Sequence, residues 1–578
     1  MERSSGGIVR TASLVGGTFL LFLHFFPALF DLPAAAANLS PFDVSVFGVQ
    51  AVKLRSVRDL AADPEWVRLG GSIALAVAIW GLVRTVPGLS SILERGWSTL
   101  RRVPERRFLL GVALAQLTLL ATISIAVFDR MPHVQDEIGQ YFQGRIFASG
   151  KLYAQPPAQP ELFSFYSVIQ TDKWYSQHPP GFPLLLAPLL LAGIPWLLNP
   201  ILGAGCTVLT FQLGKTLWGE GAGRGAALLL LVSPFHAFMG ASFMNHTATL
   251  FFLLLFAVLL VGALGTGRGA AAGVSLGIAI LTRPLVSLGI GVLFGAVAVF
   301  RADAGRRARL AAGVVAGLAL PVGFFLWYNA LTNGGPLTLG YTVADPELHR
   351  LGFASAPVPY SPLRALIKTG QLVRGLDLYL FAWPLPSLFL VWILFLRGTA
   401  GRREMLLLAA ALLVPFAYFG YWFQDMCLGP RFAYESIPFW ALLSERAFVT
   451  SRAGLPSSPG RRPFLASLVV ASVLWGLLFQ WPILARGYSA SYWGVNRELT
   501  RVVERVRLGE AVVLVEEESC PWYYGAGFWA NSPDLSGDVI YARDLGPDAT
   551  ERLSTSFPGR ALYRYDCGSG TLGSPDPR

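Results

Sequence analysis

Two polar segments in an otherwise apolar chain contain the residues best suited to chemistry. The first, residues 131–141, holds the adjacent carboxylates Asp136 and Glu137, followed by apolar residues at helical spacing. Neighbouring residues of a helix do not share a face, so the two acids are not a matched acid and base. An acid at a membrane boundary commonly has a function. We therefore expect Asp136 or Glu137 to act in catalysis or ligand binding, with capping of the helix by Asp136 as the alternative.

The second polar segment ends in Gln177-His178-Pro179-Pro180-Gly181. The two prolines fix an extended, rigid approach to the apolar residues that follow. Gln177 and His178 are therefore candidates to line a substrate or metal site, and a purely structural turn is the alternative. Asn245 and His246 open a later apolar stretch, where substrate contact and simple helix capping by Asn245 fit the sequence equally well.

A divalent metal ion is one chemistry that these residues leave open. It would require convergence of four side chains, namely Asp136, Glu137, His178 and His246. The chain lacks the His-x-x-x-His spacing that places two imidazoles on one helix face. No cofactor is therefore firmly implied.

Two arginines lie at the edges of apolar stretches. Arg283 separates two short apolar stretches, and Arg431 follows Leu428-Gly429-Pro430. A cation at such a boundary is costly unless it is paired or hydrated, and a lipid phosphate is an obvious partner. The competing explanations are snorkelling of Arg283 to headgroups and an i,i+4 ion pair of Arg431 with Glu435.

The composition places most of the chain in a lipid bilayer. Hydrophobic residues make up 53% of the 578 residues and charged residues only 14%, against about 25% charged residues in soluble proteins. The net charge of +11 comes from basic residues in short loops between apolar stretches. We attribute it to membrane topology and expect no nucleic-acid binding. The abundance of Ala, Gly and Arg suggests the cytoplasmic membrane of a high-GC bacterium.

Stretches long enough to span a bilayer predict an all-α multi-pass fold of about thirteen transmembrane helices. Residues 182–191, bounded by Pro and Gly, are too short to span and are expected to form a re-entrant or interfacial helix. With that choice, every basic loop lies on the cytoplasmic side, as does the N-terminus. The expected spans are 8–30, 68–88, 108–128, 197–217, 225–241, 247–266, 270–283, 285–300, 311–330, 376–397, 405–422, 432–448 and 463–484.

The same topology places the candidate site residues together on the outer face, in 129–180, 331–375 and 423–436 and in the turns near 245 and 283. The tail from 486 differs, because its β-rich segments are separated by Gly, Pro and Asp. It is expected to be a small extracytoplasmic α/β domain. Cys520 and Cys567 both lie there, and a disulfide between them and two unrelated thiols are equally compatible with the sequence.

The chain resembles the GT-C class of integral-membrane glycosyltransferases. Within that class it is most similar to the protein O-mannosyltransferase and lipid A aminoarabinose transferase type. The resemblance spans about residues 108–448, and no single motif is specific. It implies a catalytic core at 108–485, extra helices at 1–107 and a separate outer domain at 486–578. The matching motifs, in chain order, are Asp136-Glu137, Gly150-Lys151-Leu152-Tyr153, 174–181, 214–219, Thr282-Arg283-Pro284 and Gly429-Pro430-Arg431-Phe432.

The resemblance also implies a polyprenyl-phosphate-linked sugar donor, and it matches Asp136 to the acid that draws a proton from the acceptor hydroxyl. Arg283 and Arg431 would stabilise the departing phosphate. The acceptor would be a glycolipid, a glycan or a protein. Residues 331–375 lack recognisable acceptor-binding motifs of the protein mannosyltransferases, which counts against a protein acceptor.

Two other functions remain as hypotheses. A transporter or flippase of lipid-linked saccharides would also have many spans and intramembrane arginines, but such proteins often show paired halves with broken helices near the midplane. The third hypothesis is a non-catalytic assembly or sensor protein whose tail binds a partner. Replacing Asp136 by Asn separates an enzyme from a scaffold.

Overall fold

The structure is a computed structural model that describes most of the chain. The described residues are 2–26, 30–31, 53–54, 77–78, 81, 89–261, 266–301, 303–354, 359–454, 461–489, 492–517, 520 and 522–574. The expected span at 68–88 therefore lies almost wholly outside the described residues.

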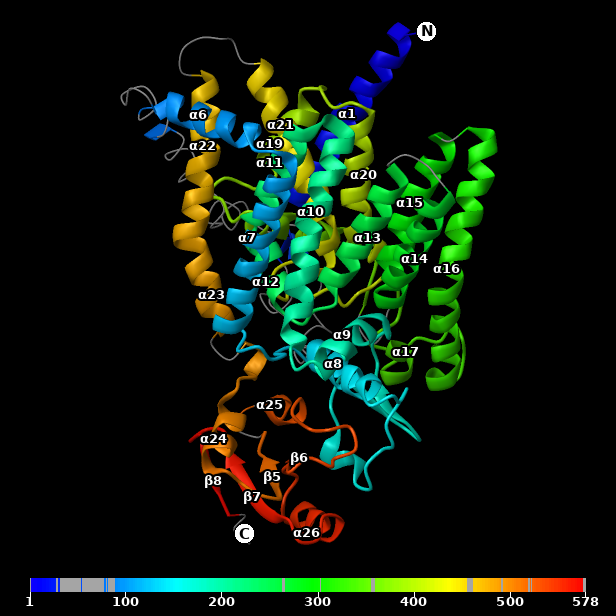
Figure 1. Ribbon diagram of the computed structural model, residues 1–578, viewed down its shortest axis with the longest axis vertical. Coiled ribbons are helices and arrows are strands. Elements are labelled where there is room, and N and C mark those ends of the chain that lie inside the picture. The colour runs from blue at the N-terminus through cyan, green and yellow to red at the C-terminus, as the bar shows by residue number, and fades with distance from the viewer. Residues whose placement is uncertain are drawn as a thin grey trace.

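The chain folds into an upright helical body with a smaller domain below it (Figure 1). Within the described residues, six helical segments are long and apolar enough to cross a membrane, or seven if a pair bent by 64° counts as one span. The multi-pass helical fold is confirmed, and the count of about thirteen is not. The six are Gly7–Phe25, Glu105–Ala126, Pro195–Trp218, Pro284–Arg301, Gly305–Asn333 and Phe464–Gly494, and the bent pair is Glu220–Leu231 with Pro234–Ala241.

Several expected spans are shorter or broken. The stretch 376–397 is divided between the end of α18 (Pro362–Tyr379) and α19 (Phe389–Leu396). The buried Asp377 carboxylate accepts a hydrogen bond from the Leu388 N–H at 2.8 Å, which satisfies a backbone group that a continuous helix would have bonded. The stretch 405–422 forms α20 (Arg402–Ala417), which has 16 residues and falls short of the length needed to span.

The helical body also contains the remaining helices of the described residues, several of which form the candidate spans. They include α1 (Glu2–Phe25), α6 (Leu89–Arg102), α7 (Glu105–Ala126), α10 (Leu198–Trp218), α11 (Glu220–Leu231), α12 (Pro234–Ala241), α13 (His246–Val261), α14 (Thr266–Thr282), α15 (Pro284–Arg301), α16 (Ala304–Asn333), α17 (Gly340–Ala344), α21 (Ile437–Gly454), α22 (Arg461–Trp475) and α23 (Trp481–Ser489).

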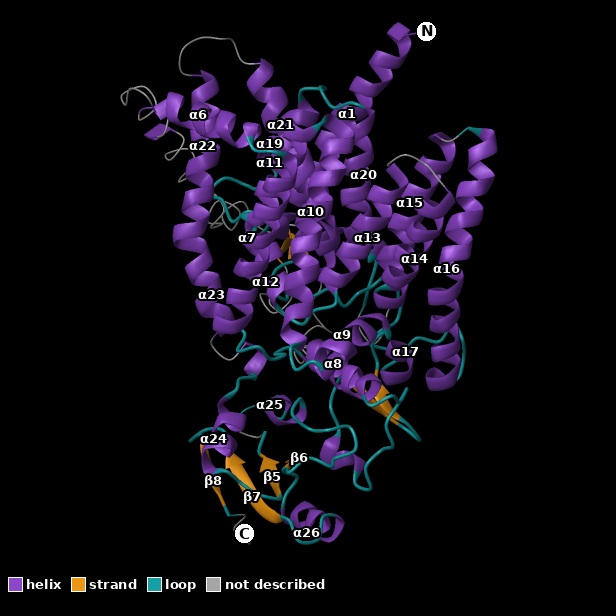
Figure 2. Cartoon of the chain, in the orientation of Figure 1, coloured by secondary structure: helices purple, strands orange, loops and turns teal. Residues whose placement is uncertain are grey.

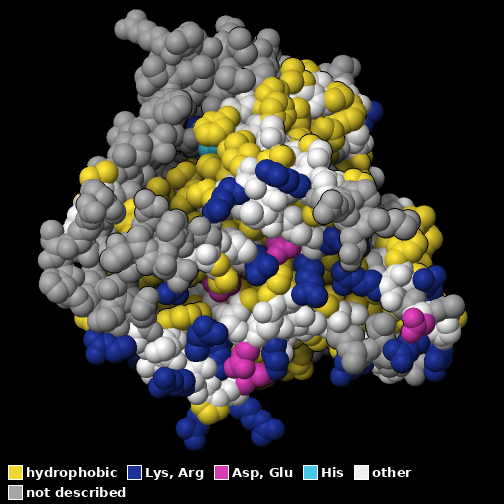
Figure 3. Space-filling view, turned by 90° about the horizontal axis from the view of Figure 1, so that it is seen from above, with side chains coloured by type: hydrophobic (Ala, Val, Ile, Leu, Met, Phe, Trp, Pro, Cys, Tyr) yellow, Lys and Arg dark blue, Asp and Glu magenta, His cyan; other side chains and the backbone are white. Residues whose placement is uncertain are grey.

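The two ends of the helical body carry different elements. Lysine and arginine side chains are scattered over the end seen from above, where the N-terminus and α6 lie (Figures 1 and 3). The opposite end carries α8 (Gln135–Ala148) and α9 (Gly181–Leu191), which lie across the body there. Helix α9 has 11 residues, a length of about 16 Å. The prediction of a helix too short to span is confirmed, and its re-entrant or interfacial place stays a prediction.

The C-terminal region is a small mixed sheet with helices, as expected. Strands β5 (Ala511–Val515), β6 (Val539–Arg543) and β7 (Ala561–Asp566) are parallel in the order β6-β5-β7, and β8 (Thr571–Gly573) is antiparallel at the edge. Figure 2 shows these strands below the helical body. Strand β5 is central and fully buried because its sequence, AVVLV, is apolar on both faces. The accompanying helices are α24 (Glu498–Val506), α25 (Gly525–Phe528) and α26 (Pro547–Ser556).

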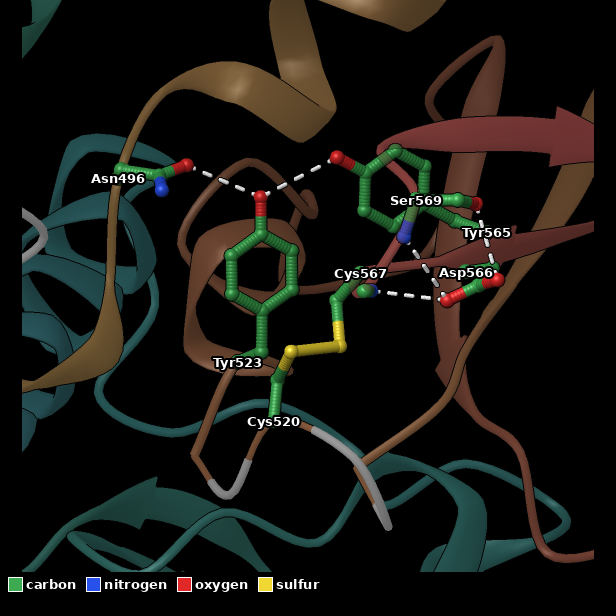
Figure 4. Close-up of a disulfide and its surroundings, with 8 residues drawn as sticks. Asn496, Cys520, Tyr523, Tyr565, Asp566, Cys567 and Ser569 are labelled. Atoms are coloured by element: carbon green, nitrogen blue, oxygen red, sulfur yellow. Dashed lines mark hydrogen bonds between the residues drawn. A yellow bond between two sulfur atoms is a disulfide. The ribbon is translucent and has the colours of Figure 1, made fainter.

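A disulfide closes this domain. Cys520 and Cys567 are joined with a Cα–Cα distance of 6.2 Å, which settles the alternative that the sequence left open (Figure 4). The bond ties the segment after β5 to the end of β7. Cys206 and Cys427 are free thiols, and both are buried.

The C-terminal domain and the segment 129–180 share one hydrophobic core. Phe165 stacks on Phe528 with ring centroids 4.7 Å apart, and Phe142 contacts the same ring. The Arg145 guanidinium donates hydrogen bonds to the carbonyl oxygens of Ala530 and Asn531. Helix α8, which carries the candidate acids, is therefore held from below by the C-terminal domain. The segment also contains a hairpin of β3 (Val168–Gln170) and β4 (Trp174–Ser176).

Candidate active site

The two adjacent acids point in different directions at the start of α8. Glu137 is buried, and its Oε2 accepts hydrogen bonds from the backbone N–H groups of His133 and Val134 at 2.8 and 3.2 Å. Its Oε1 accepts a third bond from the Phe243 N–H at 3.0 Å. Glu137 thus caps the helix and fastens it to the segment before α13. The capping role considered for Asp136 belongs to its neighbour.

Asp136 forms an ion pair with Arg431. The Arg431 Nη1 lies 2.5 Å from Asp136 Oδ2, and the same guanidinium binds both oxygens of Asp425 at 2.5 and 2.9 Å. Arg431 comes from a 3-10 helix, η4 (Arg431–Ser436), almost 300 positions along the chain. One guanidinium is therefore shared between two carboxylates. The expected alternative pairing of Arg431 with Glu435 is not found among the ion pairs of the described residues.

His178 faces the other oxygen of Asp136. The Nε2 atom is 3.7 Å from Asp136 Oδ1, is buried, and has no hydrogen-bond partner within the described part of the chain. Its Nδ1 lies 2.8 Å from the Tyr341 hydroxyl. Tyr341 thus orients the imidazole ring, and its Nε2 faces the Asp136 carboxylate. A hydroxyl group bound between them could donate a hydrogen bond to the carboxylate and accept one from Nε2–H.

Arg283, between α14 and α15, has its own set of partners. Its guanidinium contacts His246 Nε2 at 3.0 Å, Asn245 Oδ1 at 3.4 Å and the Tyr418 hydroxyl at 2.6 Å. Its Nε is 3.2 Å from Glu435 Oε1, and that carboxylate also contacts His246 Nδ1 at 3.1 Å. Asn245, His246 and Glu435 therefore hold Arg283 in place rather than line the cavity that it enters.

These groups meet in one cavity of about 590 Å³. Asp136, Gln177, His178, Arg283 and Arg431 all line it, so the structure brings together these five sequence-predicted residues. Glu137 does not line it. The wall also contains residues that sequence reasoning missed, among them Tyr341, His349, Tyr418, Asp425 and Trp493. Apolar residues complete it, including Leu285, Leu288, Leu339 and Leu351.

The proposed four-residue metal site does not assemble. Glu137 is committed to three backbone N–H groups, and His246 is committed to Glu435 and Arg283. In the part of the chain that the structure describes, one group of three side chains has ligand atoms close enough for a metal ion, namely Glu516, Asp566 and Cys567. Cys567 is in the disulfide.

The cavity changes the acidity of its own groups. Burial tends to raise the pKa of Asp136, but Arg431 and, to a smaller extent, His178 outweigh it and hold that pKa below its usual range. Burial raises the pKa of Asp425 despite the same arginine. Burial lowers the pKa of His178 to about 4, with Asp136 opposing the shift. At neutral pH, Asp136 is thus a carboxylate and His178 a neutral imidazole.

The depressed pKa of His178 predicts a pH-dependent loss of stability. In the unfolded chain a histidine takes up a proton below about pH 6.5, whereas folded His178 does so only near pH 4. Stability therefore falls as the pH drops between these values, and this group alone costs about 2 kcal/mol between pH 7 and pH 5. His178→Gln removes that contribution, so its apparent Tm should fall less between pH 7 and pH 5 than that of the wild type. Equal falls in both proteins would contradict the assignment.

Glu137→Gln is expected to weaken the fold more than the chemistry. A glutamine amide offers one acceptor oxygen where three N–H groups now converge, so at least one buried N–H loses its partner. The expected cost is about 2 kcal/mol, because the lost bonds involve a charged group. Thermal unfolding in detergent should show a lower Tm, while donor binding by the folded fraction stays within about tenfold. Loss of all transfer at an unchanged Tm would instead make Glu137 the base.

The fold is that of the GT-C membrane glycosyltransferases. The structure is similar to ArnT from Cupriavidus metallidurans in the apo state, with a TM-score of 0.51 and 15% identity over 82% of this chain and 93% of that chain. The same protein bound to undecaprenyl phosphate gives a TM-score of 0.49 at 15% identity, covering 79% and 88%. The oligosaccharyltransferase of Archaeoglobus fulgidus, solved with zinc and sulfate, gives 0.46 at 13% identity, covering 78% and 67%. Neither a protein-family model nor a curated protein sequence matches this chain.

Proposed function

We propose that this protein is a membrane glycosyltransferase that moves a sugar from a polyprenyl-phosphate donor to a hydroxyl group of a lipid, glycan or protein. The observation that carries the proposal is the single cavity in which Asp136, His178 and two arginines face apolar walls. Guanidinium groups bind phosphate, and apolar walls accept a long hydrocarbon chain. The similarity in fold to apo ArnT supports the same class of reaction.

The reaction is a displacement at C1 of the sugar. Asp136 takes the proton of the acceptor hydroxyl, and the hydroxyl oxygen forms a bond to C1 as the bond from C1 to the phosphate oxygen breaks. The electron pair of that bond leaves with polyprenyl phosphate, where Arg283 and Arg431 stabilise the growing negative charge. His178, neutral at pH 7 and oriented by Tyr341, holds the acceptor hydroxyl toward Asp136.

Because of the ion pair between Asp136 and Arg431, the donor would have to bind before Asp136 can act as a base. While Arg431 contacts Asp136, the carboxylate is a weak base, because its protonated form is disfavoured. A donor phosphate competes for the same guanidinium, and Asp425 keeps its bidentate contact on the other side. Binding of the donor would thus loosen the Asp136 contact and make this carboxylate a stronger base only when the sugar is present.

The donor lipid would be a bacterial polyprenyl phosphate. The composition fits a high-GC bacterium, and lysine and arginine side chains are present on the end of the helical body opposite α8 and α9 (Figures 1 and 3). By the positive-inside rule that end would be cytoplasmic, which supports a cavity on the outer face of the cytoplasmic membrane.

Ligand-dependent stability tests the donor class. The purified protein in nanodiscs is heated with polyprenyl phosphate or with the matching polyprenol, which lacks the phosphate. A ligand at 100 times its Kd stabilises the folded state by about 2.7 kcal/mol, so polyprenyl phosphate should raise Tm by several degrees and polyprenol should not. An equal effect of both lipids, or no effect of either, would overturn the proposal that the arginines bind the phosphate.

A further inference from the structure

A short segment, residues 492–496, connects α23 to the C-terminal domain and passes both partners of the ion pair. The Tyr492 hydroxyl accepts a hydrogen bond from the Leu428 N–H at 2.8 Å. Leu428 and Gly429 both have a positive φ, 57° and 117°, in the turn that leads into Arg431. Tyr492 therefore fastens a tight turn three residues before the guanidinium.

The same segment also fastens the start of α8. The carbonyl oxygen of Val495 lies 2.8 Å from His133 Nδ1, and the Phe128 carbonyl lies 3.0 Å from the other ring nitrogen. His133 precedes Asp136 by three residues, and its backbone N–H is bonded to Glu137. A displacement of Val495 would therefore move the first turn of α8 and Asp136 with it.

Trp493 lies between these two contacts and lines the cavity. Its backbone is left-handed, with φ 57° and ψ 29°. A bulky residue in this region costs of order 1 kcal/mol, and such outliers persist where their neighbours over-determine them. Here the bonds of Tyr492 and Val495 on either side fix the conformation that presents the indole to the cavity.

The lower end of the segment is anchored in the C-terminal domain. The Asn496 Oδ1 accepts a hydrogen bond from the Tyr523 hydroxyl at 2.9 Å, and Tyr523 stacks on Tyr565 with centroids 5.7 Å apart. Figure 4 shows this pair beside the disulfide of Cys520 and Cys567. A hydrogen bond and a ring contact thus link the C-terminal domain to the segment that lines the cavity.

We propose that Trp493 is the surface on which the sugar ring of the donor packs, and that Tyr492 and Val495 are the positioning residues that place it. This inference rests on the proposed glycosyltransferase function. Trp493 lines the same cavity as Asp136 and Arg431. Its neighbours Tyr492 and Val495 are bonded to Leu428 and His133, each three residues before one of these charged groups, which favours a place for the indole near the reacting end. The prenyl chain would contact another part of the cavity wall, formed by Leu285 and Leu288 of α15. These two side chains are 36% and 52% exposed on the surface of the helical body. A flat aromatic face suits the C–H face of a sugar ring.

Two ligands that differ only in the sugar test the proposal. Binding of polyprenyl phosphate and of a polyprenyl-phosphate sugar is measured for the wild type, Trp493→Ala and Trp493→Phe in nanodiscs. Trp475→Ala is the matched control, because Trp475 is a 38% exposed tryptophan on α22 away from the cavity. In Trp493→Ala the Kd for the sugar-bearing lipid should rise about tenfold with that for polyprenyl phosphate unchanged, and Trp493→Phe should keep most of the affinity.

Each other outcome rejects the inference in a recognisable way. If Trp493→Ala weakens the binding of both lipids equally, Trp493 shapes the cavity without contacting the sugar. If Trp493→Ala leaves the binding of both lipids unchanged, the indole is not part of the donor site. If the wild type binds neither lipid, the proposed function itself fails, and the role of Trp493 fails with it.

Discussion

Replacing Asp136 with Asn is expected to reduce sugar transfer by at least about 10³-fold while leaving donor binding within a few-fold of the wild type. Asparagine keeps the size of the side chain but has no basic oxygen to take the acceptor proton, and general-base catalysis contributes about 10²–10⁴ in rate. The fold should survive, because Arg431 retains both contacts with Asp425. Single-turnover transfer by purified variants of matched Tm measures the effect.

Two results would count against Asp136 as the base. Transfer within about tenfold of the wild type would show that another group accepts the proton. A parallel loss of donor affinity and of Tm would show that the substitution had damaged the cavity. Gln177→Ala is a suitable comparison, because Gln177 lines the same cavity but has no part in the ion pair.

Arg431→Gln should have the second largest effect, on both activity and stability. Loss of one group that stabilises the leaving phosphate is expected to lower transfer by about 10²–10³-fold. Asp425 is 4% exposed and would lose its cation, and breaking a buried pair costs about 3–5 kcal/mol. The variant should therefore unfold at a lower temperature and also turn over slowly.

A second substitution separates the two effects. Asp425→Asn with Arg431→Gln removes both charges, so Tm should recover much of the loss while transfer stays low. Recovery of transfer along with Tm would show that Arg431 serves only to neutralise Asp425. Thermal unfolding and single-turnover transfer on the same preparations distinguish these outcomes.

The sequence predicted those features that depend on local pattern. The segments expected to form short strands, 510–518, 538–542 and 561–565, overlap the parallel strands β5, β6 and β7. The short apolar stretch before Gly193 became a helix that does not span. Polar residues at the ends of apolar stretches also drew attention to Asp136, His178, Arg283 and Arg431, which the structure places around one cavity. Their functional roles stay predictions.

The rest depends on contacts between distant segments, which no local pattern encodes. Glu137 caps α8 through the nearby N–H groups of His133 and Val134, but its third bond, from the N–H of Phe243 over 100 residues away, could not be read from the local pattern. Glu435 was placed one helical turn from Arg431, but a 3-10 helix separates their faces, and Glu435 turns to Arg283. The expected span at 376–397 is broken by hydrogen bonds of Asp377, whose acceptor role follows from the fold alone.

Trp493 and Asp425 illustrate the same limit within the site. Trp493 follows an apolar helix and precedes a polar tail, a place where tryptophan commonly marks a membrane interface. Asp425 lies in a short polar segment, and its proximity to Arg431 in sequence was the one available signal. Their places in the cavity depend on tertiary contacts: Asp425 binds Arg431, and Tyr492, next to Trp493, bonds the turn at Leu428.

Sugar transfer by the wild-type protein tests the central claim most directly. Proteoliposomes containing the purified protein receive a polyprenyl-phosphate sugar labelled in the sugar and an extract of acceptor lipids and glycans. We expect the label to move to an acceptor, with one polyprenyl phosphate released for each sugar transferred, and neither product to form with Asp136→Asn. If donors of this class instead cross the bilayer intact, with no label transferred and no polyprenyl phosphate released, the protein is a transporter and not a glycosyltransferase.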